Sequence, residues 1–477
     1  MASSLVIIPL IMAAVMALVP SNRWRPWLLP LGALAHLVLV FQLIRGPMVS
    51  EWGGWLVLDP LGKVFLILIS VLFTLCMLYA PAYLNIRHDR PNRILCACLM
   101  TALALMTLVI LSHHLGLMWV AMEATTLATA PALYFDRNPL SLEATWKYLV
   151  ICSVGIALAL LGSFFLAYAS LYAGQDPSLL FDDLVRQARG LSSPWLHAAF
   201  ILLFIGYGTK MGLAPMHTWK PDAYGETPGL VGALLAGGLT NCALLAILRI
   251  YQIGQAAGAT AFMREILVFM GLLSMTVAAL FMVRQRDFKR LLAYSSVEHM
   301  GILVLGLGIG GAAIFAMLLH MINNGLTKGV LFLSAGNIHR AYGSKLTDHV
   351  SGALRRVPLS GGLFLAGFLA STGSPPFGPF ISEFSILNAS FGTGQYFAAG
   401  LFVALMTVVF FAMGATVLAV VMGNPSKPVV ETSFRECFWV SVPVLALMGL
   451  VLMLGVFIPP PLVSLLRDAA ALLEPGR

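Results

Sequence analysis

The sequence has few charged residues. Only 10% of its 477 residues are Asp, Glu, Lys or Arg, whereas soluble domains carry about 25%. Hydrophobic residues make up 59% of the chain, and the mean hydropathy is +0.90. So little charge cannot cover the surface of a soluble domain of this size. The composition predicts an all-α polytopic membrane protein in contact with the lipid bilayer.

The cysteines show none of the spacings that bind metals or iron–sulfur clusters. Six cysteines are present, and only Cys96 and Cys98 lie close together in the sequence. The sequence contains no recognisable nucleophile–base set and no cofactor motif. We therefore expect no cofactor, no metal site and no catalytic centre of its own. Whether the chain is a subunit of a larger enzyme stays open.

The net charge of +8 would suit nucleic-acid binding. The basic residues, however, lie in short loops between apolar runs and form no patch with aromatic residues, so no nucleic-acid partner is expected. Loops on alternate sides differ about twofold in Lys and Arg content, with Arg93, Lys220 and Lys427 on the richer side and Arg45 on the other. The richer side is predicted to be cytoplasmic, which places both termini outside.

Long apolar runs predict about fourteen membrane-spanning helices. Loop 46–60 is polar and aromatic-rich and could form a hairpin, and segment 174–196 is predicted to be an amphipathic external connection. The expected spans are 3–19, 27–45, 60–84, 93–111, 115–135, 143–173, 197–217, 228–252, 262–284, 290–309, 312–336, 358–384, 396–422 and 436–458.

Two blocks of five spans follow one another in the chain. An odd number of spans per block means that the second block crosses the membrane inverted, as in many transporters. We therefore expect two inverted five-helix repeats, with a further segment at each end. The four parts are an N-terminal three-span segment (1–92), the first block (93–252), the second block (262–422) and a C-terminal span with a short tail (423–477).

The third span of each block is predicted to be broken. In the first block, Lys210 lies at apolar depth and Pro215 follows; in the second, the stretch from Ser371 to Pro379 is rich in Gly and Pro. A helix broken at membrane depth is tolerated only where protein or a water-filled cavity surrounds it. Paired breaks in two halves indicate a binding or conduction site.

A small set of ionisable and polar residues lies at apolar depth. A charged side chain there costs about 2.5–3.5 kcal/mol on insertion scales, so it needs a partner or a water-filled cavity. His320, Asn324 and Lys328 are spaced four residues apart, which places them on one face of a helix. The predicted proton-path residues are Glu123, Lys210, Glu298, His320, Asn324, Lys328 and Glu383.

These residues also have a purely structural interpretation. Glu123 and Lys210 could form a salt bridge that only holds helices together, Glu298 could lie near the interface, and His320 could be a simple hydrogen-bond partner. The recurrence of acids and bases in both inverted blocks favours proton movement instead. Lysine suits that role because its pKa shifts readily on burial, whereas arginine stays charged. Moving Glu123 toward or away from Lys210 would change the proton affinity of Lys210.

Four motifs make the chain similar to a known family. They are Trp119 to Glu123, Lys210 to Ala223 with its Pro-Met-His-Thr-Trp core, Lys289 to Ser296 (Lys-Arg-Leu-Leu-Ala-Tyr-Ser-Ser), and Asn324 to Gly336. With these motifs the chain resembles the antiporter-like subunits of respiratory complex I, of Mrp-type sodium/proton antiporters and of membrane-bound group 4 hydrogenases. The resemblance covers most of the chain and is strongest from about 90 to 420. It implies a fold of fourteen helices with two inverted units.

The resemblance also implies roles for single residues. Glu123 matches the family's membrane glutamate, Lys210 its paired lysine, Lys328 the central lysine and Glu383 the terminal charged residue. Two departures stand out: the stretch 232–241 lacks a histidine that members often carry, and Asn324 replaces a frequent histidine. We therefore expect water and Asn324 to carry more of the central path.

Within the family, the stretches 122–131 and 142–158 look most like the F component of hydrogenase-4. This implies proton translocation driven by a peripheral redox arm, with hydrogenase-like and iron–sulfur subunits and other membrane subunits as partners, in a bacterial or archaeal inner membrane. Three alternatives remain. They are an Mrp-like cation/proton antiporter, a proton-conducting subunit of an inorganic-carbon uptake complex, and a structural scaffold in which buried charges only support assembly.

Overall fold

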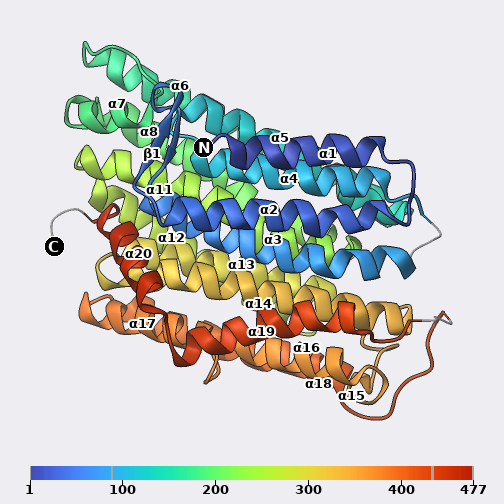
Figure 1. Ribbon diagram of the computed structural model, residues 1–477. Helices are drawn as coiled ribbons and strands as arrows, with labels where there is room; N and C mark the ends of the chain where they lie inside the picture. Colours follow the sequence, from blue (N-terminus) through green and yellow to red (C-terminus); the bar gives the residue numbers. More distant parts are fainter. Residues whose placement is uncertain (1, 87–89, 431–433, 475–477) are drawn as a thin grey trace.

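The computed structural model describes residues 2–86, 90–430 and 434–474, which form a bundle of long, nearly parallel helices (Figure 1). One short antiparallel hairpin pairs strands β1 (Val49–Glu51) and β2 (Leu56–Leu58), with Ser50 opposite Val57. The helices are α1 (Ser4–Leu18), α2 (Arg25–Ile44), α3 (Pro60–Ile86), α4 (Arg93–Leu111), α5 (Leu115–Leu133), α6 (Pro139–Tyr172), α7 (Phe181–Gln187), α8 (Ser193–Met211), α9 (Trp219–Glu226), α10 (Gly229–Leu234), α11 (Thr240–Ala256), α12 (Thr260–Met282), α13 (Phe288–Ile309), α14 (Ala312–Tyr342), α15 (Ala353–Arg356), α16 (Pro358–Ser371), α17 (Gly378–Gly392), α18 (Tyr396–Val421), α19 (Phe438–Val456) and α20 (Pro460–Ala471).

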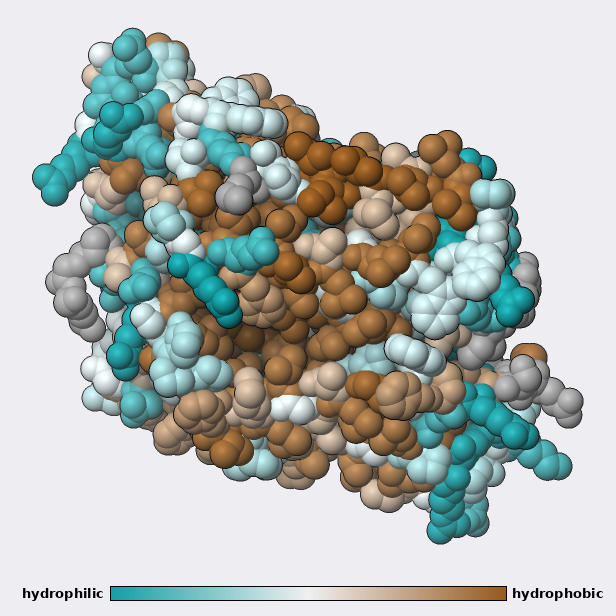
Figure 2. All heavy atoms as spheres, viewed as in Figure 1, coloured by the Kyte–Doolittle hydropathy of each residue, from teal (hydrophilic) through white to brown (hydrophobic). Residues whose placement is uncertain are grey.

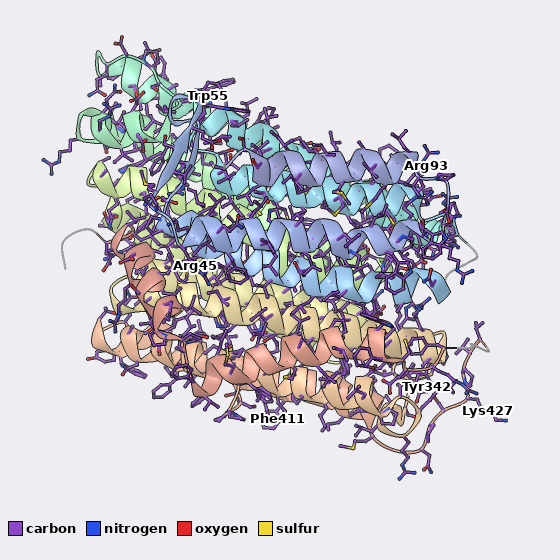
Figure 3. All side chains as sticks on the ribbon, viewed as in Figure 1. Arg45, Trp55, Arg93, Tyr342, Phe411 and Lys427 are labelled. Atoms are coloured by element: carbon purple, nitrogen blue, oxygen red, sulfur yellow. The ribbon has the colours of Figure 1, made fainter. Side chains whose placement is uncertain are left out.

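The surface of the bundle is that of a membrane protein. Within the described ranges, nine helical segments are long and apolar enough to cross a bilayer. Figure 2 shows hydrophobic residues over the middle of the visible face and hydrophilic residues toward its two ends. Arg93 and Lys427 lie at one end of the bundle and Arg45 toward the other (Figure 3), the separation that the loop charges predicted. The chain is thus a helical, multi-pass membrane protein.

Helix α14 lies at the centre of the bundle although it is not among the most apolar helices. Almost all of its side chains are buried, and it packs against α13, α16, α17 and α10. It carries His320, Asn324 and Lys328 into this interior. Because burying polar groups is costly unless they are paired, the helices around α14 must supply hydrogen-bond partners.

Both predicted breaks are present. Helix α8 ends at Met211, where Gly212 adopts a left-handed conformation with φ 79°, and the chain resumes as the short helix α9. Helix α16 ends at Ser371, and α17 begins at Gly378. Each break therefore ends a helix at a buried residue, Met211 or Ser371.

One irregularity was not predicted. The span expected over 228–252 is divided by a π-helical segment, Leu235–Leu239, between α10 and α11. There the Asn241 side-chain amide donates to the Gly237 carbonyl at 2.8 Å. Single π turns often occur at functional sites, and this one faces α14 and α3 across glycines.

The predicted hairpin in loop 46–60 is confirmed, and it leads into a buried ion pair. Arg249, near the end of α11, donates to both carboxylate oxygens of Asp59 at 2.7 Å. Burial raises the pKa of Asp59, but the charge and hydrogen bonds of Arg249 outweigh it and lower the pKa to about 2. The pair thus connects the loop before α3 to α11.

Replacing Asp59 by Asn is expected to lower the free energy of unfolding by about 3–5 kcal/mol, because Arg249 would stay buried without its counter-charge. Because the folded-state pKa lies below the unfolded value of about 4, the pair stabilises the fold fully above that pH. Its contribution is lost as the pH falls toward about 2. Thermal melting in detergent across this pH range checks both effects. Asp348→Asn, which breaks an exposed pair with Arg286, is the control and should cost less than about 1 kcal/mol.

Candidate functional site

Lys210 lies in the last turn of α8 in a fully buried position. Its ammonium donates to the Thr126 hydroxyl at 2.5 Å and to the Tyr148 hydroxyl at 3.1 Å. It also lies 5.0 Å from the centre of the Tyr148 ring. These contacts come from α5 and α6, so the end of the broken helix is held by its two neighbours through neutral groups.

Glu123 is half-buried on α5, and the hydroxyl of Thr126 connects it to Lys210. Its carboxylate accepts from Ser153 at 2.6 Å and from Thr126 at 3.2 Å. The Thr126 hydroxyl therefore accepts from the ammonium of Lys210 and donates to the carboxylate of Glu123. Among the described residues these two charged groups form no direct ion pair within 4 Å. We call Glu123, Thr126, Tyr148, Ser153 and Lys210 the Glu–Lys cluster.

Thr126→Val is expected to slow any proton transfer between Glu123 and Lys210 about tenfold or more, because valine keeps the shape of threonine but removes the bridging hydroxyl. Thr126→Ser keeps the hydroxyl and should retain most of the flux. Proton flux in membrane vesicles, normalised to the amount of assembled protein, distinguishes the two variants. Equal flux in both would mean that this hydroxyl carries no proton.

Lys220 was expected among the charges of an exposed loop, and that expectation is wrong. The structure buries it completely on α9, where its ammonium donates to the Ser296 hydroxyl at 3.3 Å and lies 5.9 Å from the Tyr224 ring. A charge after a helix break resembles a loop charge in sequence. Here, however, the segment after the break turns back into the bundle and carries Lys220 inward.

Lys328 on α14 begins a second group of hydrogen bonds. Its ammonium donates to the Ser295 hydroxyl of α13 at 2.6 Å. Ser295 lies 3.2 Å from the hydroxyl of Ser371, which in turn lies 2.9 Å from Nε2 of His299. Since Ser371 is the last residue of α16, the second break delivers a hydroxyl to this point.

The contacts continue through two histidines. Nδ1 of His299 lies 3.1 Å from Nε2 of His320, and Nδ1 of His320 lies 3.0 Å from the Ser382 hydroxyl on α17. Glu383 Oε1 lies 3.9 Å from His299 Nδ1. An unbroken series of hydrogen-bonding side chains thus crosses four helices; we call it the polar row, consisting of Lys328, Ser295, Ser371, His299, His320 and Ser382.

Lys220 and the polar row approach each other on α13. Lys220 contacts Ser296, and Lys328 contacts the preceding residue, Ser295. In the described part of the chain, no side-chain hydrogen bonds connect Lys210 to Lys220. Aromatic rings run beside that interval, since Trp219 lies 5.1 Å from Tyr148 and 5.9 Å from Tyr224.

Two predicted residues are buried beside the row without partners in the described structure. Both carboxylate oxygens of Glu298 and both amide atoms of Asn324 lack a hydrogen bond. Such groups cost about 1–3 kcal/mol each unless ordered water pairs with them. These positions are therefore where the row most needs water, and the role expected for Asn324 stays a prediction.

The residues predicted for the proton path did not include His299 or the serines of the row. His299 is recognisable in the sequence as an ionisable residue at apolar depth beside Glu298, but nothing in the sequence assigned it to the path. The serines gave no signal, because Ser and Thr in helices commonly bond their own backbone, as Ser334 does with the Val330 carbonyl at 2.6 Å. Whether a hydroxyl turns outward to a neighbouring helix depends on the packing of that helix.

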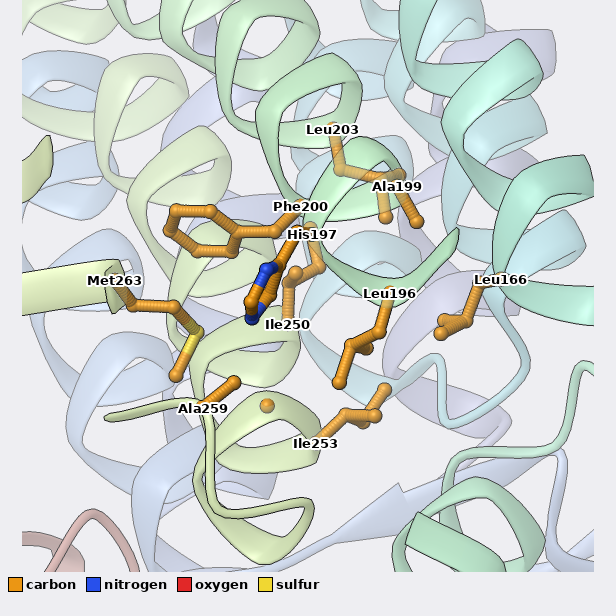
Figure 4. A pocket seen from close by; sticks show the side chains of 11 residues that line it. Leu166, Leu196, His197, Ala199, Phe200, Leu203, Ile250, Ile253, Ala259 and Met263 are labelled. Carbon is orange, nitrogen blue, oxygen red and sulfur yellow. The ribbon is translucent and has the colours of Figure 1, made fainter. Parts of the chain in front are cut away.

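A small apolar void near His197 is separate from the row (Figure 4). Its volume is about 10 Å³, and side chains of α6, α8, α11 and α12 line it. The His197 ring stacks on Phe262 at 4.0 Å. A cavity of this size and lining offers no path for a charged species.

A family model described as NADH:quinone oxidoreductase/Mrp antiporter, transmembrane, matches residues 112–410. Over 99% of its length the chain is 36% identical to the hydrogenase-4 component F homolog of Methylacidiphilum infernorum, which it covers fully. It is 32% identical to NADH-quinone oxidoreductase subunit N of Desulforudis audaxviator over 85% of this chain and 84% of the relative.

Solved structures share the fold. The chain superposes on a chain of the Mrp complex of Dietzia with a TM-score of 0.85 and 21% identity, over 99% of this chain and 98% of the other. A chain of respiratory complex I of Thermus thermophilus gives a TM-score of 0.83 at 23% identity, over 99% and 100%. The match to the family model over more than half of the sequence, together with the full-length relative, shows that the chain belongs to the NADH:quinone oxidoreductase/Mrp antiporter family of transmembrane proteins.

Proposed function

We propose that this chain is a proton-translocating, antiporter-like subunit of a membrane complex of the hydrogenase-4 or complex I type. The observation that carries the proposal is the polar row, which runs from Lys328 to Ser382 through atoms no more than 3.2 Å apart. A scaffold needs paired charges, but it does not need a continuous series of groups that both donate and accept protons. Serine and histidine side chains are such groups.

The path that we propose begins at Glu123 and Lys210, passes Lys220 and reaches Lys328 through the adjacent serines of α13. From there protons follow the polar row to Glu383, with Glu298 and Asn324 holding water beside it. Both breaks support this path, because each ends a helix at a residue that belongs to it or adjoins it. We assign the redox chemistry to partner subunits, because the sequence contains no recognisable cofactor motif.

The proposed membrane topology has fourteen spans. The nine apolar helical segments are joined by α1, α5, α8, α14 and the broken pair α16–α17, which are shorter or more polar. In this topology the parts 93–252 and 262–422 are inverted repeats, flanked by 1–92 and 423–477. The start of α1 and the whole of α20 lie at the end of the bundle that carries Arg45 (Figures 1 and 3). We assign this end to the outside of a bacterial or archaeal inner membrane.

The first experiment is purification of the tagged chain from its native membrane in mild detergent, with partners identified by mass spectrometry. Hydrogenase-like and iron–sulfur subunits in the eluate would support a redox-driven pump. Recovery with other Mrp-type subunits, together with sodium-dependent proton flux, would favour the cation/proton antiporter that the shared fold also allows. A different soluble partner would favour inorganic-carbon uptake.

A second experiment separates transport from assembly. Glu123→Gln and Lys210→Ala should abolish coupled proton pumping in vesicles while the complex still assembles. Glu143→Gln is the control, since it removes an exposed carboxylate that pairs with Lys147 at 2.7 Å on α6. Lost assembly in both path variants would support the scaffold, and unchanged pumping would exclude the path.

A further inference from the structure

Three buried side chains from three helices converge at the end of the polar row. They are His299 on α13, His320 on α14 and Glu383 on α17, and one donor atom of each lies within 4.8 Å of the others. His299 Nδ1 is 3.1 Å from His320 Nε2 and 3.9 Å from Glu383 Oε1. Ligand atoms at about 2.0–2.2 Å from a tetrahedral zinc ion lie about 3.3 Å from one another. The two imidazole nitrogens therefore already have nearly this spacing, and a small movement of the Glu383 side chain would bring its oxygen to the same distance.

Neighbouring hydroxyls fix the orientation of both imidazoles. Ser371 holds Nε2 of His299 at 2.9 Å, and Ser382 holds Nδ1 of His320 at 3.0 Å. The remaining nitrogens must then face each other. In metal sites the second ring nitrogen of a ligating histidine is usually held in this way, which sets the tautomer and the direction of the lone pair.

The third ligand is free to complete the site. Oε1 of Glu383 is buried and has no hydrogen-bond partner in the described structure. Glu383 also lines a groove of about 390 Å³ between α17, α18 and the residues that follow α16; Phe411, at the edge of the bundle, is another lining residue (Figure 3).

We propose that His299, His320 and Glu383 form a binding site for a divalent transition-metal ion, with zinc as the best fit. Two imidazole nitrogens and one carboxylate oxygen, with a fourth position open, are a zinc donor set, whereas calcium and magnesium prefer oxygen ligands alone. A metal site here could not be predicted from the sequence, because its ligands come from three separate helices and have no characteristic spacing.

Bound metal would interrupt the polar row. The ion takes the lone pairs of His299 Nδ1 and His320 Nε2, the same two atoms between which a proton would pass. This consequence rests on the proposed function, whereas metal binding itself does not. Zinc would therefore act as a reversible inhibitor of proton flux.

The binding test uses the purified chain, in whatever complex it forms, titrated with Co²⁺ as a spectroscopic probe and with Zn²⁺ in competition. One equivalent of Co²⁺ should bind with visible d–d absorption typical of mixed nitrogen and oxygen ligands. His299→Gln and Glu383→Gln should each weaken binding at least about tenfold, and Ser371→Ala should weaken it by about tenfold through the orienting hydroxyl. Ser371→Ala and Glu383→Gln change volume little, so they test the site even if a histidine variant fails to fold.

The matched control is His36→Gln. His36 is also a buried histidine in a membrane helix, but its nitrogens bond only Ser70 and Thr107, both at 3.1 Å. Unchanged metal affinity is expected there. Absence of the cobalt absorption in the unmodified protein, or equal affinity in the His299, Glu383 and control variants, would overturn the site.

Zinc is then added to vesicles in which proton flux is measured. Inhibition of the unmodified protein at zinc concentrations that match its affinity in the cobalt competition, reversed by a chelator, would establish that the metal interrupts the row. Binding without inhibition would overturn the interruption and leave the site. If the chain translocates no protons at all, the proposed function fails, and the cobalt titration still decides whether the metal site exists.

Discussion

Lys328→Met is expected to reduce proton translocation by about 100-fold or more while the protein still folds and assembles. Methionine keeps most of the lysine volume, so little cavity forms in the core around α14. The variant removes the ammonium that donates to Ser295 at 2.6 Å and leaves the polar row without its charged end. Removal of a fully buried charge should not in itself destabilise the protein.

Lys328→Arg makes the prediction sharper. Arginine remains charged in proteins and cannot release its proton, so it keeps the positive charge while removing the titration. We expect this variant to be inactive as well. Flux in the arginine variant would show that only the charge matters and that Lys328 does not itself exchange protons.

The measurement is dye quenching in inverted membrane vesicles, normalised to assembled protein, together with the melting temperature in detergent. Lys427→Met is the matched control, because Lys427 is exposed at one end of the bundle (Figure 3) and is not part of the buried polar row. It should retain full flux.

Much of the fold could be predicted because apolar runs of membrane length leave little choice of structure. The hairpin in 46–60 and both breaks followed from Gly and Pro content. The π segment that divides the predicted span 228–252 could not be predicted in this way. A π turn contains one residue more than an α turn, and no distinct composition marks it in the sequence.

The candidate site was only partly predictable, and for a physical reason. Charged residues at apolar depth are conspicuous, so Lys210 and Lys328 could be singled out. The groups that join them are ordinary hydroxyls, Thr126, Ser295 and Ser371, which are common in membrane helices and inexpensive to bury. Their partners lie on other helices, so only the packed structure shows which hydroxyls form bridges and which bond their own backbone.

The burial of Lys220 leads to the second large effect. Gly212, with φ 79°, turns the chain after α8, and a Cβ added to it would lie 2.2 Å from Cε and 2.8 Å from Nζ of Lys220. Gly212→Ala must therefore move the Lys220 side chain. Because Lys220 is fully enclosed, that movement is expected to break its contact with Ser296 and to reduce proton flux at least about tenfold.

Gly258→Ala separates this effect from backbone strain. Gly258 has nearly the same backbone conformation, with φ 81°, but no atom lies within 4 Å of the position of its added Cβ. Both substitutions carry the left-handed backbone cost of about 1–2 kcal/mol. Melting temperatures should therefore fall by similar amounts, and only Gly212→Ala should lose flux.

The three possible results have different meanings. Loss of flux in Gly212→Ala alone would place Lys220 in the path, where it connects the Glu–Lys cluster to the serines of α13. Loss in both variants would mean that flux depends on the stability of the assembly. Full flux in Gly212→Ala would exclude Lys220 from the path, and protons would then have to cross from Lys210 to Lys328 along water held beside Glu298 and Asn324.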